Sequence, residues 1–291
     1  MVIGHARFEG VSEMETRAEA SAVPMRRTRP NGLAAFYRRN LALCRGAVSL
    51  GAGLLLWEWV ARYLIKSTLI IVPPSHVVEA FAELMAKGEL QTHVYTSGFE
   101  FIVGFGLAAA VGIAFGIAIG VSDAVRDVLD PWLSALYATP VVAFAPLFVI
   151  WMGIGPSSKV AVAFLLAVLP IIINTSAGIR TTEQNLVDVA RSFAASRPQV
   201  FRKILIPYAL PFIIAGLRLG VGRAIIGVVV AEFFGTRAGL GYMILVSSQL
   251  FDTSALFVAV VILAGAGVLS VIGLQKLERW LAPWREYTIR T

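Results

Sequence analysis

The feature that most constrains the fold of this chain is a series of six long apolar runs, at about 47–65, 98–120, 132–152, 160–177, 211–231 and 255–275. A helix needs about 20 apolar residues to cross the roughly 30 Å of hydrocarbon in a bilayer. Strands of a membrane barrel would alternate apolar and polar residues over short segments, and these runs do not. Because backbone polar groups in lipid must be bonded internally, we predict an all-α polytopic membrane protein with about six transmembrane helices.

The composition agrees with this class and excludes several functions. Only 15% of the residues are charged and the mean hydropathy is +0.77, against about 25% charged residues in soluble proteins. A single cysteine, Cys44, and three scattered histidines predict neither an internal disulfide nor a metal site. No nucleophile–base set and no GxxxxGK[ST] phosphate loop is present, so we expect no enzyme activity and no cofactor in this chain.

The distribution of Lys and Arg predicts the orientation in the membrane. The N-terminal tail holds eight basic residues, the 178–210 loop five and the C-terminal tail four, whereas the opposite side holds few. We therefore expect both termini and the 178–210 loop to be cytoplasmic, with 1–46 a flexible tail, 47–275 the transmembrane domain and 276–291 a second tail. The net charge of +7 is explained by this topology and by anionic lipid headgroups rather than by an acidic substrate. We expect no nucleic-acid partner.

Small residues recur at every fourth position of the second run. Four-residue spacing forms one stripe on a helix, and such stripes let helices approach closely in lipid. We expect this stripe to pack against another helix of the same chain. Its members are Gly104, Ala108, Gly112, Gly116 and Gly120.

Few ionisable residues fall within the apolar runs. Most of them are near the predicted ends, where the charged group reaches the interface. We expect ordinary interfacial roles for Glu58, Glu100, Arg218, Arg223 and Glu232.

Uncharged polar residues and prolines also occur within or beside the runs. They suit a lightly polar path for a solute, since proline removes a backbone donor and bends a helix. Hydrogen bonds between helices explain any single residue at least as well. The residues that we expect to line a translocation path are Tyr137, Thr139, Pro140, Asn174 and Glu232.

The loop at 178–210 has the pattern of a short helix followed by a return. Apolar residues recur at helical spacing from Leu186 to Ala194, and Pro198 suits the first turn of a next helix, where a missing N–H is not costly. Pro207 and Pro211 are expected to interrupt the chain as it re-enters the lipid. The residues alone leave two interpretations open: the helix docks into a groove of a cytosolic protein, or it rests on the membrane surface.

The same loop resembles the EAA loop of ABC importer permeases. Asp188-Val189-Ala190 stands at the EAA position, Ala194 replaces the usual glycine, and Ile204 and Pro207 match the I and P of the motif. From about residue 70 to 285 the chain is similar to the nitrate/taurine/alkanesulfonate-type permeases. The matching segments are PPS at 73–75, GELQTH at 88–93, PLFVIWMGIGPSSK at 146–159, GLR at 216–218, AEFFGTRAGLGYMI at 231–244 and WLAPWRE at 280–286.

The resemblance implies a type I importer-like permease in the bacterial inner membrane, with a cytoplasmic coupling helix. Its implied partners are a second permease copy, two cytosolic ATPase subunits that use ATP and Mg²⁺, and an extracytoplasmic solute-binding protein. The implied cargo is a small solute, in particular an anion such as nitrate, bicarbonate, taurine or another sulfonate. The residues implied to couple to the ATPase are Asp188, Ala190, Arg191, Ala194, Ala195, Ser196, Arg197 and Pro207.

Two alternatives and two departures accompany this interpretation. An ion-coupled secondary transporter is the main alternative, and an intramembrane enzyme or scaffold is a third. Ala194 adds a methyl group where the family has glycine, and Glu100 stands where many relatives carry a basic residue.

Overall fold

The computed structural model describes residues 41–65, 67 and 69–283. The chain divides into two compact units, residues 1–56 and 57–291. Most of helix α3 (Leu41–Trp59) belongs to the first unit, and a π-helical turn (Val60–Leu64) follows it in the second. The first apolar run is therefore helical as predicted. Most of the two predicted tails, at 1–40 and 284–291, lies outside the described residues.

The described part of the second unit consists of helices joined by short connections. Four of its helices are long and apolar enough to cross a membrane: α5, α8, the segment Arg197–Glu232 and α13. They contain the second, fourth, fifth and sixth predicted runs. The elements are α4 (Pro74–Lys87), α5 (Glu89–Val121), α6 (Asp123–Ala138), a 3₁₀ turn (Val141–Phe144), α7 (Ala145–Met152), α8 (Pro156–Arg180), α9 (Gln184–Ser192), α10 (Arg197–Val200), a π-helical turn (Phe201–Leu205), α11 (Ile206–Glu232), α12 (Leu240–Gln249) and α13 (Thr253–Leu281).

The third apolar run, 132–152, is not one straight span. It forms the second half of α6 and then Val141–Met152, and these two helices meet at 84°. The bend lies at Thr139, whose ψ of 137° is extended, and at Pro140, which has no N–H to continue the helical bonding. The pair counts as a fifth span only if both arms are taken together.

The expected interruption at Pro207 and Pro211 is wrong. Helical structure continues from Arg197 to Glu232 over 36 residues. The π-helical turn immediately before Ile206 has a wider bonding pattern, and Pro207 then occupies one of the first positions of α11, where a missing donor is tolerated. The π-helical turn therefore accommodates the missing N–H of Pro207, and the helix continues through it.

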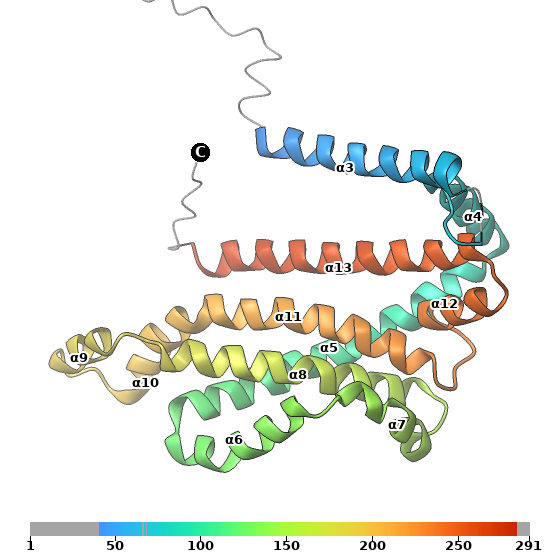
Figure 1. Ribbon diagram of the computed structural model, residues 1–291. Coiled ribbons are helices and arrows are strands. Elements are labelled where there is room, and N and C mark those ends of the chain that lie inside the picture. The colour runs from blue at the N-terminus through green and yellow to red at the C-terminus, as the bar shows by residue number, and fades with distance from the viewer. Residues whose placement is uncertain (1–40, 66, 68, 284–291) are drawn as a thin grey trace, which may run out of the picture. The chain divides into compact units, whose positions relative to one another are not determined.

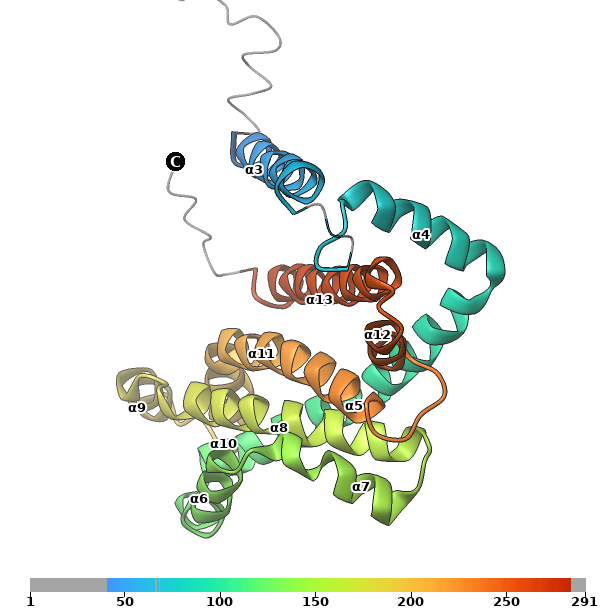
Figure 2. The same ribbon diagram turned by 45° about the vertical axis from the view of Figure 1, so that its right-hand side comes forward.

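The core of the second unit is α8, which packs along α5 on one side and α11 on the other (Figures 1 and 2). The small stripe predicted on α5 faces α8. A Cβ at Gly112 would lie 2.8 Å from the Cβ of Ile171, and a Cβ at Gly116 would lie 2.5 Å from the Cβ of Thr175. The predicted close packing within the subunit is confirmed.

Glycines of α11 allow the same approach on the opposite face of α8. A Cβ at Gly227 would lie 2.8 Å from the Cα of Ala163, and one at Gly220 would lie 2.9 Å from the Cδ1 of Ile171. Ile171 is fully buried between the two neighbouring helices. Three backbones are therefore held at short separation by residues without side chains.

Helix α4 follows the first apolar run. Proline occupies its first turn, and Gly88, with φ of 78°, ends it in the left-handed conformation. Its Val77 is buried in a smaller cluster with Met243 of α12 and Val258 of α13. One face of α4 therefore packs on protein.

The packing predicts a position-dependent response of α5 to added methyl groups. Gly116→Ala should lower the stability of the folded protein by about 1–3 kcal/mol, because the new methyl group overlaps Thr175 and the carbonyl of Ile172. Thermal unfolding in detergent, followed by size-exclusion chromatography, measures this. Gly106→Ala is the matched control, since nothing lies within 4 Å of a Cβ there. Equal melting temperatures for the two variants would contradict the packing.

Candidate functional site

The loop between α8 and α11 lies at one end of the helix bundle. In Figure 1, α9 and α10 extend beyond the ends of α5 and α8. Val187 of α9 is buried, whereas Asp188, Val189 and Arg191 are exposed. The predicted short helix and return are therefore present, and most of the α9 surface is open to a partner.

The turn that ends α9 explains the residue that departs from the family pattern. The N–H of Ala195 donates to the carbonyl of Ala190 over 3.0 Å, and the N–H of Ala194 donates to the carbonyl of Arg191 over 2.9 Å. These two bonds form a Schellman motif with Ala194 at the left-handed position, where φ is 55°. Glycine is favoured there because it has no Cβ to clash with the backbone.

The structure brings seven of the eight predicted coupling residues onto this loop. Asp188, Arg191, Ala194, Ser196 and Arg197 are exposed, and Ala190 and Ala195 are partly buried. Pro207 lies beyond the loop, in the first turn of α11.

Phe193 is the exposed aromatic residue that the predicted coupling set omits. Its side chain is 83% exposed, next to a cavity of about 240 Å³ that Ala190, Ala195 and Lys203 also line. The sequence contained a signal for it, because aromatic residues on polar cytoplasmic loops are enriched at interfaces. In the sequence, Phe193 was counted only as one member of the apolar pattern of α9.

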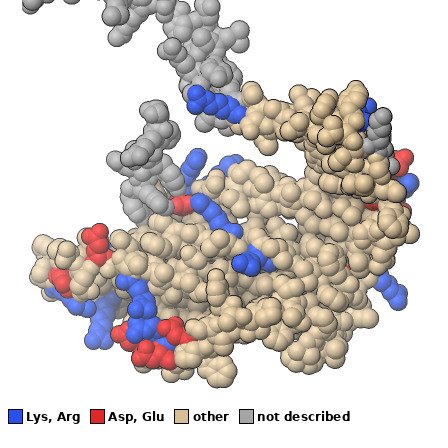
Figure 3. Space-filling model, in the orientation of Figure 1, with Lys and Arg blue, Asp and Glu red and all other residues tan. Residues whose placement is uncertain are grey.

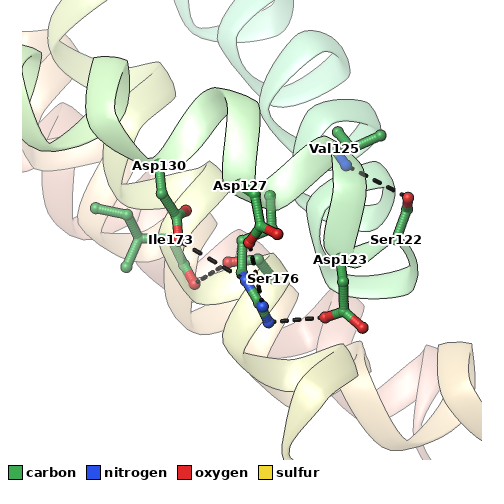
Figure 4. A network of polar contacts seen from close by, with 8 residues as sticks. Ser122, Asp123, Val125, Asp127, Asp130, Ile173 and Ser176 are labelled. Carbon is green, nitrogen blue, oxygen red and sulfur yellow. Dashed lines mark hydrogen bonds and ion pairs between the residues drawn. The ribbon is translucent and has the colours of Figure 1, made fainter.

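Charged side chains gather at the same end of the bundle (Figure 3). Beside the basic loop, the start of α6 carries an acidic group. Figure 4 shows Asp123, Asp127 and Asp130 around the guanidinium of Arg126, at 2.8, 3.3 and 4.0 Å. One cation cannot neutralise three carboxylates, so this corner remains acidic.

A second feature is a cavity of about 490 Å³ at the bend between α6 and α7. Three of the five predicted path residues, Tyr137, Thr139 and Pro140, line it. Pro170 of α8 and Arg223 of α11 complete its wall. The bend therefore opens a space that faces the middle of two long helices.

The other two predicted path residues do not line this cavity. The Asn174 amide donates to the carbonyl of Pro170, one turn back in its own helix, over 2.8 Å. Glu232 is 1% exposed and lies at the far end of α11.

Glu232 belongs to a buried polar cluster that holds the start of α12. The Ser97 hydroxyl donates to Glu232 Oε1 over 2.6 Å and accepts from the N–H of Leu240 over 2.7 Å. The N–H of Gly241 donates to Glu232 Oε2. A carboxylate at a helix N-terminus compensates its free N–H groups and the positive end of its dipole. A Cβ on Gly239, whose φ is 127°, would overlap the Glu232 carboxylate.

Glu100 and Lys159 extend this cluster. Each is 1% exposed, and the Lys159 ammonium donates to the carbonyl of Gly235 over 2.9 Å. Both line a cavity of about 480 Å³ with Arg237. The predicted interfacial position is therefore wrong for Glu100 and Glu232, because neighbouring helices enclose them. The Lys159 ammonium interacts electrostatically with both carboxylates and offsets one of their two negative charges within the protein.

Residues 110–284 match the family of binding-protein-dependent transport system inner membrane components. The chain belongs to this family. It is a transport permease, and ATP hydrolysis is the task of a separate subunit. The family membership that the EAA-like loop indicated is confirmed. It excludes the two alternatives, a secondary transporter and an intramembrane enzyme.

Three relatives with assigned transport functions are similar to this chain along most of their length. The chain is 35% identical to the putative aliphatic sulfonates transport permease protein SsuC of Bacillus subtilis, over 85% of this chain and 90% of the relative. It is 32% identical to the taurine transport system permease protein TauC of Escherichia coli, over 79% of this chain and 86% of the relative. It is 37% identical to the riboflavin transport system permease protein RibX of Chloroflexus aurantiacus, over 79% of this chain and 87% of the relative.

A solved structure supports the fold. The inward-facing MetNI methionine ABC transporter matches with a TM-score of 0.58 at 16% identity, over 66% of this chain and 95% of that chain. The helical permease fold is thereby confirmed.

The Schellman turn predicts the effect of restoring glycine. Ala194→Gly should raise the stability of the loop by up to about 1 kcal/mol, because it removes the steric clash of a Cβ in the left-handed conformation. The greater flexibility of glycine in the unfolded chain offsets only part of this gain. Amide hydrogen exchange of 184–200 measures this as slower exchange. Ala190→Gly, inside α9, should act in the opposite direction. Faster exchange in Ala194→Gly would contradict the assigned turn.

The polar cluster predicts a cost for removing one hydroxyl group. Ser97→Ala should destabilise the protein by about 1–3 kcal/mol, since Glu232 loses a donor and Leu240 loses an acceptor in a buried place. Thermal unfolding measures the loss. Ser270→Ala is the control, because Ser270 only donates to the carbonyl of Ala266 in its own helix. An unchanged melting temperature for Ser97→Ala would show that the cluster does not hold α12.

Proposed function

We propose that two copies of this permease and two cytosolic ATPase subunits form an importer for a small anion. Nitrate, bicarbonate, taurine and other sulfonates are the expected class, delivered by an extracytoplasmic solute-binding protein. The relatives named for sulfonates and taurine support this choice. Both termini and the α9–α10 loop would face the cytoplasm of a bacterial cell, in keeping with the excess of Lys and Arg on that side.

The observation that carries the proposal is the exposed α9–α10 loop at one end of the bundle. Asp188, Arg191, Phe193, Ser196 and Arg197 are open to a protein that docks from the cytoplasm. The small residues at the partly buried positions allow a close approach of the partner. Leu186, Val189 and Phe193 are exposed and recur at helical spacing along α9, so a protein with an apolar groove would bury them on docking.

The continuous helix from Arg197 to Glu232 supplies the mechanical link. ATP and Mg²⁺ bound to the ATPases would bring the two loops together, and a displaced α10 would carry α11 with it, because no break separates them. At its other end α11 holds the start of α12 through Glu232. Closure on the cytoplasmic side is thus transmitted to the opposite face as a rigid-body movement.

Solute would pass between the permease copies along the cavity at the α6–α7 bend. Tyr137, Thr139 and Pro140 are proposed to line this path. Asn174 lies one turn of α8 from Pro170 and would be met next. Glu232 would act on the path indirectly, through α12.

The docking proposal predicts a strong effect at one aromatic residue. Phe193→Ala should weaken association with the ATPase by about 30-fold, since exposed aromatic anchors contribute about 2 kcal/mol or more. Co-purification from membranes that express the whole transporter, followed by titration of the ATPase, measures this.

Phe251→Ala is the matched control. Phe251 is 71% exposed but lies between α12 and α13, so association should be unchanged. Ala195→Trp provides a second test, because a large side chain would block the close approach. Full ATPase binding by both loop variants would refute the coupling assignment.

A further inference from the structure

Arg223 lies far inside a membrane-spanning helix. It stands nine residues before Glu232, the last residue of α11. At 1.5 Å per residue, this is about 14 Å from that end and about 26 Å from the first residue, Ile206. Arg223 is therefore about 14 Å or more from either end of α11, rather than near an end as expected.

The guanidinium of Arg223 has no compensating partner in the described part of the chain. No hydrogen bond or ion pair joins it to another described residue, and the side chain is exposed. Arg218, on the same helix, differs in this respect, since it forms an ion pair with Glu278 of α13. An arginine in the middle of a span is energetically costly when it faces hydrocarbon, and such residues often mark solute pathways.

The cavity beside Arg223 has the size and polarity for a small anion. Its volume is about 490 Å³, within the range of about 300–1,000 Å³ that is typical of small-molecule sites. The described residues that line it include no Asp or Glu, so Arg223 is the charge that dominates there. Tyr137, 67% exposed, adds a phenol.

The backbone around the cavity also favours water. Pro170 cannot donate to the carbonyl of Leu166, and both residues line the cavity. The bend at Thr139 and Pro140 interrupts helical bonding on the opposite wall. Backbone polar groups of this kind are tolerated at membrane depth where they line a hydrated space.

We propose that Arg223 is the residue that selects anions in this permease. Its guanidinium binds the oxygens of a small oxyanion, such as a sulfonate, carboxylate or nitrate, in the cavity between the α6–α7 bend and α11. Planar guanidinium groups pair with two oxygens of such anions. The inference rests on the proposed function, since it names the residue by which the importer recognises its solute class.

Charge-selective thiol labelling tests the proposal on the permease alone. The native cysteine is removed by Cys44→Ser, and Tyr137→Cys introduces a thiol on the cavity wall. In lipid nanodiscs, where both faces are open, the thiol reacts with 2-sulfonatoethyl methanethiosulfonate, an anion, or with 2-(trimethylammonium)ethyl methanethiosulfonate, a cation. The ratio of the two rates, anion to cation, should fall on the order of tenfold on Arg223→Gln, because a nearby unit charge acts oppositely on the two reagents.

Two further variants make the test specific. Arg223→Lys keeps the charge and should keep the ratio within about twofold. Arg237→Gln removes an exposed cation that does not line this cavity, and should leave the ratio unchanged. Gel filtration checks that every variant is folded. If Arg223→Gln is unstable, Arg223→Met, which also removes the charge, takes its place.

Several outcomes would overturn the proposal. No reaction with either reagent would mean that Tyr137 faces lipid. An equal ratio with Arg223 and with glutamine would mean that a carboxylate of the second copy neutralises the guanidinium. Since no ATPase is present, these results are independent of the coupling assignment, which fails separately if the ATPase does not bind the loop.

Discussion

The close approach of α8 to α5 and α11 is the constraint on which the rest of the second unit depends. Hydrophobic association does not drive helices together in lipid, because the lipid tails are as apolar as the side chains. Dispersion contacts must therefore supply the cohesion, and they need short distances. Glycines on α5 and α11 give α8 those distances on both faces, and Ile171 fills the space between them. The loop, the bend and the polar cluster all occupy positions that this three-helix core sets.

The continuous helix would also allow a movement at one end of the unit to reach the other. Helical structure from Arg197 to Glu232 is continuous through a π-helical turn, although two prolines lie near its start. The far end is bound to α12 by hydrogen bonds with Glu232 and Ser97. A force applied to α10 therefore acts on two elements at the opposite face, whereas a flexible joint at Pro207 would have dissipated it.

Much of this architecture was predictable from residue type and spacing. Long apolar runs predict helices because lipid offers no alternative bonding, and the stripe from Gly104 to Gly120 predicts a packed face. A bend at Pro140 was predictable because proline removes a backbone donor, but its angle of 84° was not, since the composition of an apolar run does not depend on how its helix bends. Burial of Glu100, Lys159 and Glu232 together was not predicted either, since it depends on three helices that are distant in sequence.

The two arginines of α11 show why tertiary context decides the role of a charge. Arg218 and Arg223 are five residues apart, which places them about 140° apart around a helix of 3.6 residues per turn. One therefore faces α13, where Glu278 neutralises it, and the other faces the cavity at the bend, where the described lining has no carboxylate. Sequence position alone assigned both to the interface. An ion pair holds two helices together, whereas a cation with no partner among the described residues leaves a positive field in the cavity beside it.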